Sequence, residues 1–440
     1  MKTKILLLLS ILIISSMVLG ACATPTEEPT TEPEPTEVIE EPEPTEAIEE
    51  PEPTEVVKEP EAEAVTITIW HQWNDEYAEN IAAVFADYEA ANPGVKIDLS
   101  KPEDVANALN VAIPAGEGPD IIGWANDKIG EQALVGNIVA LNDFGVDAAM
   151  LEEIYTDPGI KGVTWQDMIW GLPETMEGIA LVFNADLVGE EYMPTDPMDF
   201  ADLLAKATKF QEDTGLVLVC NQGLGNPDAY HVAPVYFGHG MPEYVDDQGN
   251  AYMNTPEAIA AGDWMVEFSK VSLTETSHEL CLSNMVEGKV GSWWTGPWAI
   301  ADLEKNGINY TILPMGSPFV GIKTVLMTKN AVDRGNEQIA LDVMKWFTSP
   351  DVQAQLALIN KTIPAQMAAL ENPEVAALPT LAGFGASLSL GVPMANTPYA
   401  SAQWGPVGDA TTAIWTGAQT VQEALDAAQA AIEDAIAQMQ

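Results

Sequence analysis

Tryptophans set among polar residues are the side chains of this sequence whose chemistry is most informative. The chain contains 12 tryptophans in 440 residues, and Trp124 is followed closely by Asp127 and Lys128. An indole face packs well against a flat ring that carries hydroxyl groups, and a carboxylate accepts strong charge-assisted hydrogen bonds from such hydroxyls. Trp298 and Trp404 are further tryptophans with polar neighbours. These residue types favour a site that binds hydroxylated rings.

Each of these side chains also has a purely structural interpretation. Trp124 could belong to the hydrophobic core, and Asp127 could be a solvated surface charge. Glu177 precedes a stretch that has the pattern of a buried strand, where a carboxylate needs hydrogen-bond partners. Trp293 and Trp294 are adjacent on an expected strand and therefore point to opposite faces, so one of the two is expected in the core.

The elements expected to position these residues alternate between strands and helices. The pattern predicts, in order, a strand, a helix, a strand, a helix and a strand over residues 65–70, 77–91, 95–99, 105–112 and 121–124. This order predicts an α/β fold whose parallel sheet has helices on both faces. Ligands bind at the carboxyl ends of strands in such sheets, where residues 73–75 and 124–128 fall.

Later segments continue the alternation. Further strands are expected over residues 178–183, 216–220 and 290–294, and Pro297 suits the first position of a helix. The last helix is expected to begin with a capping box from Thr420 to Glu423. Its buried stripe is expected to consist of Leu425, Ala428, Ile432, Ala435 and Met439.

The first 64 residues predict a lipid tether. Lys2 and Lys4 precede an apolar run over Ile5–Val18, which is typical of a signal peptide over residues 1–21. The small residues before Cys22 suit cleavage by lipoprotein signal peptidase, after which the Cys22 thiol would be lipidated. Residues 22–64 repeat Glu, Pro and Thr, a composition that cannot bury enough apolar area to fold and indicates a stiff spacer.

Composition excludes several classes of function. The formal net charge is -50, so the chain is expected to be repelled by nucleic acid and anionic lipid. With Cys22 lipidated, Cys220 and Cys281 remain in an oxidising setting, and their pairing stays open. No phosphate loop, nucleophile elbow or zinc pattern is present in the sequence, so we expect neither a cofactor nor a metal.

An ordered set of motifs resembles the periplasmic maltose/maltodextrin-binding proteins. The segment Gly118–Lys128 is similar to the GPDI-x-x-W-A-x-D stretch of that family. Other landmarks follow in the family's order and extend the resemblance over essentially all of residues 65–440: Leu172–Pro173, Glu177, Phe183–Leu187, Thr295–Ala299, Leu313–Pro314, Pro318–Gly321 and Ala402–Trp404.

The resemblance implies a two-lobed α/β fold with a hinge and a ligand cleft between the lobes. By analogy, lobe 1 holds residues 65–175 and 325–363, and lobe 2 holds residues 178–320 and 368–440. It also implies a monomer that is not an enzyme, and that delivers an oligosaccharide to the permease subunits of an ABC importer. The implied ligand-binding residues are Trp73, Asn74, Asp75, Trp124, Asp127, Lys128, Glu177, Tyr230, Trp298 and Trp404.

Two other classes of protein share some of these features. A secreted glycoside hydrolase would also combine a tryptophan-lined cleft with two carboxylates, although nothing further in the sequence indicates an acid/base pair. A surface adhesion module would use the same lipid and spacer, and it would need no buried cleft. The sugar itself stays open, with malto-oligosaccharides first and other oligosaccharides next.

Overall fold

Two β-sheets organise the part of the chain that the structure describes. The structure is a computed structural model, and it describes residues 64–73, 75–103 and 105–439. Cys22, the expected signal peptide and nearly all of the expected spacer lie outside these residues. Within the described residues, no helix combines the length and the apolar character that crossing a membrane would require.

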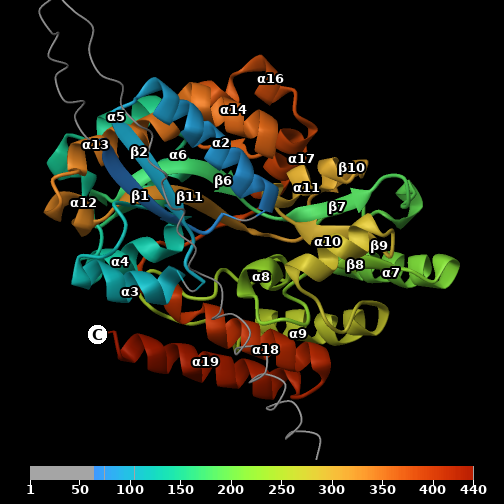
Figure 1. The fold of residues 1–440 in the computed structure, drawn as a ribbon. Helices are drawn as coiled ribbons and strands as arrows, with labels where there is room; N and C mark the ends of the chain where they lie inside the picture. Colours follow the sequence, from blue (N-terminus) through green and yellow to red (C-terminus); the bar gives the residue numbers. More distant parts are fainter. Residues whose placement is uncertain (1–63, 74, 104, 440) are drawn as a thin grey trace, which may run out of the picture. The chain divides into compact units, whose positions relative to one another are not determined.

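The first sheet has seven strands (Figure 1), in the order β12-β6-β11-β3-β1-β2 with β13 paired to β11. Its strands are β1 Val65–His71, β2 Val95–Ser100, β3 Ile121–Ala125, β6 Gly171–Glu177, β11 Phe319–Met327, β12 Ile363–Pro364 and β13 Val392–Pro393. Strands β1, β2 and β3 are parallel, as predicted, but β11 runs antiparallel to both β3 and β6. The sheet as a whole is mixed, because a strand from a distant segment enters it in the opposite direction.

Helices cover both faces of the first sheet, as the alternation predicts. In Figure 1 one group lies above the sheet and the other lies below it, and the buried apolar side chains of the two groups form separate clusters. The upper group contains α2 Asp75–Ala91, α13 Glu337–Phe347 and α14 Pro350–Asn360. The lower group contains α3 Val105–Ala115 and α4 Ile129–Leu134.

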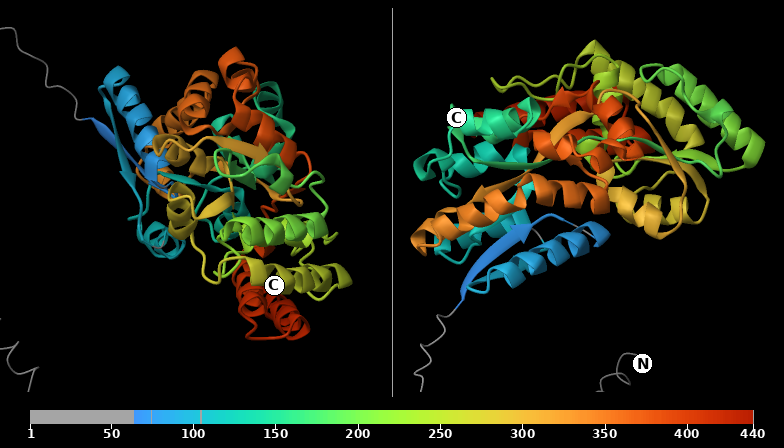
Figure 2. Two further views of the ribbon diagram at one scale, coloured as in Figure 1. Left: turned by 90° about the vertical axis from the view of Figure 1, so that its right-hand side faces the viewer. Right: turned by 90° about the horizontal axis from the view of Figure 1, so that it is seen from above.

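The second sheet has four strands in the order β10-β7-β9-β8. Its strands are β7 Ala180–Asn184, β8 Val217–Cys220, β9 Val290–Thr295 and β10 Tyr310–Leu313. One face packs against α7 Phe200–Thr214 and α8 Ala229–Gly238, and the other packs against α10 His278–Val286, α11 Ile300–Lys305 and α17 Pro379–Leu388. Outside α8 lie α9 Pro256–Phe268, α18 Trp404–Thr416 and α19 Val421–Ala437. Helices α18 and α19 lie side by side in the views of Figures 1 and 2.

Short elements connect these layers. A two-stranded ribbon is formed by β4 Thr164–Trp165 and β5 Met168–Ile169. The short helices are α5 Ala148–Ile154, α6 Asp157–Val163, α12 Lys329–Asp333, α15 Met367–Leu370 and α16 Pro373–Ala376. The short 3₁₀ helices are η1 Asn126–Lys128, η2 Leu141–Phe144, η3 Glu190–Tyr192, η4 Ser269–Val271, η5 Pro297–Ala299 and η6 Pro398–Ala402.

Two expectations about buried residues need correction. Trp293 and Trp294 are both fully buried, because helices cover both faces of the second sheet and each indole enters a different cluster. The capping box of α19 is present as predicted, but the stripe does not extend to Met439. The helix ends at Ala437 and Met439 is 42 % exposed, whereas Ile436 is buried in its place.

Three chain segments link the two sheets. Strand β6 leads directly into β7, and β10 leads into β11. The third segment lies beyond β13, where the side-chain amide of Asn126 donates to the carbonyl of Met394 and the carbonyl of Asn396 accepts from the amide of Gly130. The four strands of the second sheet lie within residues 178–320, which the resemblance assigned to lobe 2. In the first sheet, β11 begins at Phe319 and β13 lies at Val392–Pro393, both within ranges that were also assigned to lobe 2. The lobe division and its boundaries stay a prediction.

A disulfide between Cys220 and Cys281 joins β8 to α10 on one face of the second sheet, with a Cα–Cα distance of 5.6 Å. It closes a chain loop with a sequence separation of 61. Such a cross-link stabilises a protein mainly by restricting the unfolded chain, typically by about 2–4 kcal/mol. Replacing both cysteines by alanine is therefore expected to lower the free energy of unfolding by about that amount, measured by denaturant or thermal unfolding. Equal stability of the variant and the wild type would contradict this role.

Candidate ligand-binding site

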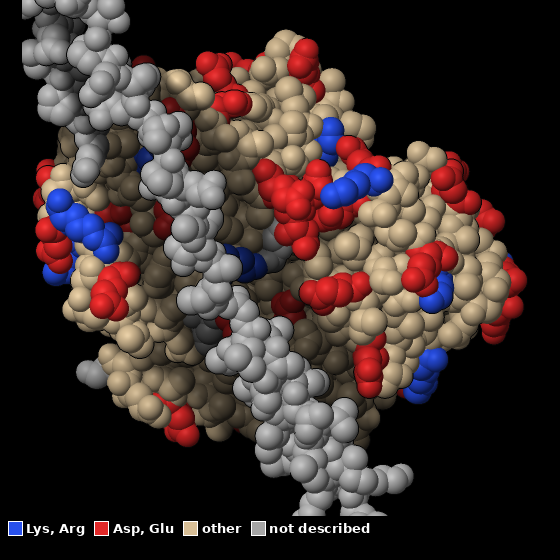
Figure 3. All heavy atoms as spheres, in the orientation of Figure 1, with Lys and Arg blue, Asp and Glu red and all other residues tan. Residues whose placement is uncertain are grey.

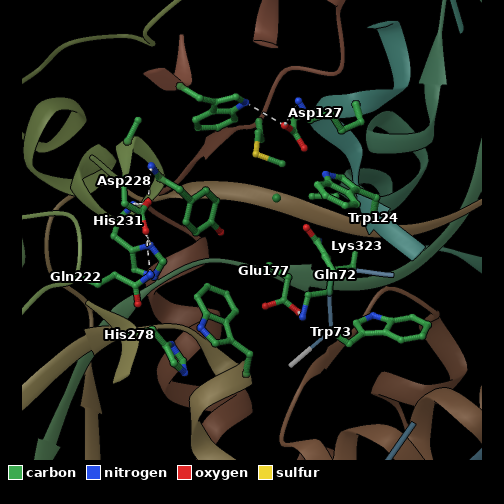
Figure 4. Close-up of a pocket in the computed structure, with 18 of the residues that line it drawn as sticks. Gln72, Trp73, Trp124, Asp127, Glu177, Gln222, Asp228, His231, His278 and Lys323 are labelled. Carbon is green, nitrogen blue, oxygen red and sulfur yellow. Dashed lines mark hydrogen bonds and ion pairs between the residues drawn. The ribbon is translucent and has the colours of Figure 1, made fainter. Parts of the chain in front are cut away.

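A cavity of about 790 Å³ lies between the edges of the two sheets. Its wall is formed by residues from α2, β3, η1, β6 and β11 of the first sheet's layers, and from α8, α10, η5 and α18 of the second (Figure 4). The predicted ligand-binding residues that the structure describes all line it, namely Trp73, Asp75, Trp124, Asp127, Lys128, Glu177, Tyr230, Trp298 and Trp404. Asn74 lies outside the described residues.

Three tryptophans of the wall are half-buried, in contrast to the fully buried Trp293 and Trp294. Trp124 is at the carboxyl end of β3, Trp298 lies in η5, and Trp404 is the first residue of α18. Each indole is held by the element that carries it and leaves part of its surface toward the cavity. Aromatic faces from distant segments of the chain are thereby brought to one space (Figure 4).

Trp73 has a different setting from the other three. Its side chain is only 3 % exposed, stacks on His71 with ring centroids 4.7 Å apart, and packs against Phe347 in the core. It contributes to the wall of the cavity, but it is tied to the core beneath α13. Its loop continues to Asp75, whose backbone has a φ of 49°.

Asp127 connects two of the predicted site residues. Its Oδ2 accepts a hydrogen bond from the indole Nε1 of Trp404 at 2.9 Å and lies 4.0 Å from the Nζ of Lys128. Burial raises the pKa of Asp127, while the Lys128 cation and the Trp404 bond act in the opposite direction. The carboxylate therefore orients the Trp404 ring, and its second oxygen remains for a ligand.

Glu177 lies at the end of β6 and, like Asp127, has a lysine beside it. Its Oε1 accepts from the Thr175 hydroxyl at 2.6 Å and lies 3.4 Å from the Nζ of Lys323 on β11. The side chains of Glu177 and Lys323 are 5 % and 12 % exposed. Because both are largely removed from water, each lowers the cost of burying the other's charge.

Two histidines complete the charged wall on the other side of the cavity. The Nδ1 of His231 lies 2.8 Å from the Oδ2 of Asp228. Burial by itself would raise the pKa of Asp228, but His231 and a hydrogen bond from Gln222 lower it far below its usual range. The Nε2 of His278 lies 3.7 Å from the Oδ2 of Asp75. Asp75, Asp127, Glu177 and Asp228 therefore each have a lysine or a histidine within 4.0 Å.

Several buried polar atoms of the wall have no hydrogen-bond partner among the described residues. They are Glu177 Oε2, Gln222 Oε1, the Tyr230 hydroxyl and His231 Nε2. Buried polar groups are nearly always hydrogen-bonded in folded proteins, so unpartnered donors and acceptors around one cavity indicate a place for a polar ligand. Within the described residues no cluster of side chains suits a metal ion.

Sequence reasoning missed several residues of this wall, among them Tyr77, Asp228, His231 and Lys323. Tyr77 fits the apolar stripe of α2 and gives no sign of a second role. Asp228 and His231 were not separable from other scattered polar residues. Lys323 did carry a signal, because a single lysine inside the otherwise apolar strand Phe319–Met327 needs a partner.

Comparisons with known proteins agree with this architecture. The curated relatives include a maltotriose-binding protein of Pyrococcus abyssi, 26 % identical over 355 residues that cover 78 % of this chain and 75 % of the relative. They also include a galactooligosaccharide-binding protein of Bacillus subtilis, 23 % identical over 338 residues that cover 72 % of this chain and 76 % of the relative.

Solved structures show the same fold. A maltose/maltodextrin-binding domain from Bdellovibrio bacteriovorus bound to maltotriose superimposes with a TM-score of 0.76 at 19 % identity, over 84 % of this chain and 100 % of that one. A maltotriose-binding protein from Thermus thermophilus gives a TM-score of 0.73 at 21 % identity, again over 84 % and 100 % of the two chains. The predicted fold class is confirmed.

A match that covers most of the chain identifies the family. The family model of bacterial extracellular solute-binding proteins matches residues 83–383 of the sequence. This span includes strands of both sheets and most of the cavity wall, and the resemblance noted in the sequence is thereby confirmed at the level of the family. The chain belongs to the family of bacterial extracellular solute-binding proteins.

Proposed function

We propose that this protein captures oligosaccharides of the malto-oligosaccharide type outside the cytoplasm and delivers them to an ABC importer. The observation that carries the proposal is the cavity wall, which combines half-buried indoles with unpartnered polar atoms. A sugar ring presents apolar C–H faces and a rim of hydroxyls, so it would use both kinds of group at once. The family binds solutes and is non-catalytic, so the carboxylates are ligand contacts in this proposal.

The charge pattern of the cavity supports a neutral ligand. A carboxylate that already has a lysine within 4.0 Å, as Asp127 and Glu177 have, does not require a second positive charge from the ligand. Such a pair can still accept and donate hydrogen bonds, which is what sugar hydroxyls require. The volume of about 790 Å³ lies within the range of about 300–1,000 Å³ that is common for small-molecule sites, and it leaves room for more than one ring.

The relatives support the choice of sugar. Proteins from Pyrococcus abyssi and Thermus thermophilus are named for maltotriose, and the Bdellovibrio bacteriovorus domain holds it. The Bacillus subtilis relative is named for galactooligosaccharides, so the family also accepts other linkages. Trp124, Trp298 and Trp404 give three platforms for successive rings, which favours an oligosaccharide over a monosaccharide.

The proposal includes motion of two lobes and a lipid tether. Three linking segments between two separate sheets are the arrangement in which hinge closure around a ligand takes place. The tether rests on Cys22 and on the Glu/Pro/Thr-rich residues that follow it, which lie outside the described residues. A binding protein held at the membrane by a long spacer would remain close to its importer.

Calorimetric titration of the purified protein with a panel of oligosaccharides tests the proposal. Maltotriose is expected to bind, to change the intrinsic tryptophan fluorescence and to raise the melting temperature, because a ligand that binds only the folded state stabilises it. At about 100 times the dissociation constant the gain is about 2.7 kcal/mol. Glucose is the control and is expected to bind much more weakly. If no oligosaccharide of any linkage produces either signal, the proposal is wrong.

Replacement of the stacking platforms should weaken binding without unfolding the protein. Trp298→Ala and Trp404→Ala are each expected to reduce the affinity for maltotriose about tenfold or more, which corresponds to about 1.4 kcal/mol. Trp165→Ala is the matched control, because this half-buried tryptophan lies on the β4–β5 ribbon and is absent from the cavity wall. A large loss of unliganded stability in the first two variants would assign those indoles to the core instead.

The tether is tested by phase partitioning of the mature protein in a detergent extract. The wild-type chain is expected in the detergent phase, because several buried acyl chains at about 0.8 kcal/mol per methylene give stable attachment. Cys22→Ser is expected to leave the protein unprocessed or to release it. Recovery of the mature wild-type chain in the aqueous phase would contradict the tether and would leave sugar binding untouched.

A further inference from the structure

A buried lysine at the inner wall of the cavity has no counterpart among the residues that the sequence singled out. Building on the proposed function, we propose that Lys323 contacts the sugar and determines specificity, and that buried Glu174 and Tyr77 position its ammonium group. Lys323 is on β11 and lines the cavity together with Tyr77, whereas Glu174 lies behind them on β6. Figure 4 shows Lys323 and Glu177 side by side in the cavity.

The ammonium of Lys323 is enclosed by aromatic rings. Its Nζ lies 3.9 Å from the ring centroid of Tyr77 and 5.7 Å from that of Trp298, distances at which a cation is attracted to a ring face. Among the described residues it makes one ion pair, with Glu177 at 3.4 Å, and no hydrogen bond. An ammonium has three N–H donors, so donors remain for a ligand in the cavity.

Glu174 holds this arrangement from behind. It is 0 % exposed, and its Oε1 accepts a hydrogen bond from the Tyr77 hydroxyl at 2.9 Å. Because Glu174 is absent from the cavity wall, it acts on a ligand only through Tyr77 and Lys323. Glu174 thus fixes the hydroxyl of Tyr77, and the ring face of Tyr77 contacts the ammonium of Lys323. The carboxylate of Glu174 also attracts this ammonium from the side away from the cavity.

The chemistry that this arrangement recognises is a pair of neighbouring hydroxyls. Lys323 supplies N–H donors and Glu177 supplies an unpartnered buried acceptor, Oε2, immediately beside them. One hydroxyl of a ring can accept from Lys323 while the next donates to Glu177. Trp298 is close enough to Lys323 for the same ring to stack on its face. A sugar ring with both hydroxyls free is therefore favoured at this position.

Burial and the neighbouring charges decide the protonation state of Glu174. Burial raises the pKa of Glu174 to about 7, while the Lys323 cation and the Tyr77 hydrogen bond act against this rise and Glu177 adds to it. Helices α6 and α13 also pack on β6, and their charged residues point away from it. On α6, Asp157 and Lys161 are exposed. On α13, Asp342 is exposed, and Glu337 and Lys345 are partly exposed.

The ionised form of Glu174 is the one that positions Lys323. Glu174 is fully buried and absent from the cavity wall, so a sugar in the cavity removes no further water from it. Its charge acts on the ligand through the ammonium of Lys323, which the carboxylate attracts and the protonated acid does not. Affinity is therefore expected to rise as the pH rises through the pKa of Glu174.

Calorimetric titration with maltotriose between pH 6 and pH 8 tests the role of Glu174. The affinity of the wild type is expected to rise across this range, because ionised Glu174 attracts the ammonium of Lys323. Glu174→Gln is expected to bind with an affinity that does not rise, because the amide still accepts the Tyr77 hydrogen bond but does not titrate. Glu89→Gln, at a partly exposed surface ion pair with Lys96, is the matched control and should behave like the wild type.

Lys323→Met provides the second measurement. It is expected to weaken maltotriose binding about tenfold or more, whereas Lys329→Met, which removes an exposed lysine paired with Asp333, should have no effect. Unchanged affinity in Lys323→Met, or the same pH dependence of affinity in wild type and Glu174→Gln, would overturn this inference while sugar binding stands. Failure of the wild type to bind any oligosaccharide would overturn the proposed function together with it.

Discussion

The antiparallel pairing of β6 with β11 is the interaction on which the rest of this architecture depends. Both strands connect the first sheet to the second, and their register places Lys323 opposite Thr175 and Gly321 opposite Glu177. A register shift between Lys323 and Thr324 interrupts the ladder there, and such irregularities re-aim side chains near functional sites. The same pair of strands thus joins the two layers and delivers a carboxylate and an ammonium to the cavity between them.

The two kinds of tryptophan in this protein show how location decides the use of an indole. Trp293 and Trp294 lie in the middle of a sheet that is covered on both faces, so neither face of that strand meets solvent. Trp124 and Trp404 lie at the ends of β3 and α18, Trp298 lies in the short helix η5, and all three are only partly buried. Element ends and this short helix are therefore the positions where this fold offers aromatic surface to a ligand.

The sequence predicted the fold class and the outline of the site, because hydrophobic periodicity and strand ends are local signals. Trp124, Asp127 and Lys128 could be found since they follow a buried strand in immediate succession. The direction of β11 could not be found, because antiparallel entry depends on a pairing with segments far along the chain. The partners of Glu174 and Lys323 could not be found for the same reason. They become visible only when β6, β11 and α2 are packed together.

The charge inside the cavity differs from the charge of the whole molecule, because several carboxylates of the cavity wall have a lysine or a histidine beside them. The chain carries a formal net charge of -50, and acidic side chains are spread over the face of the described residues in Figure 3, with a basic group inside a hollow. Such a field acts on charged solutes and is screened by dissolved ions. A neutral solute has no net charge for this field to act on, so it is neither steered nor repelled. Its capture should therefore proceed at nearly the same rate in dilute and in saline surroundings, which suits a protein that works outside the cytoplasm, where ionic strength is set by the environment.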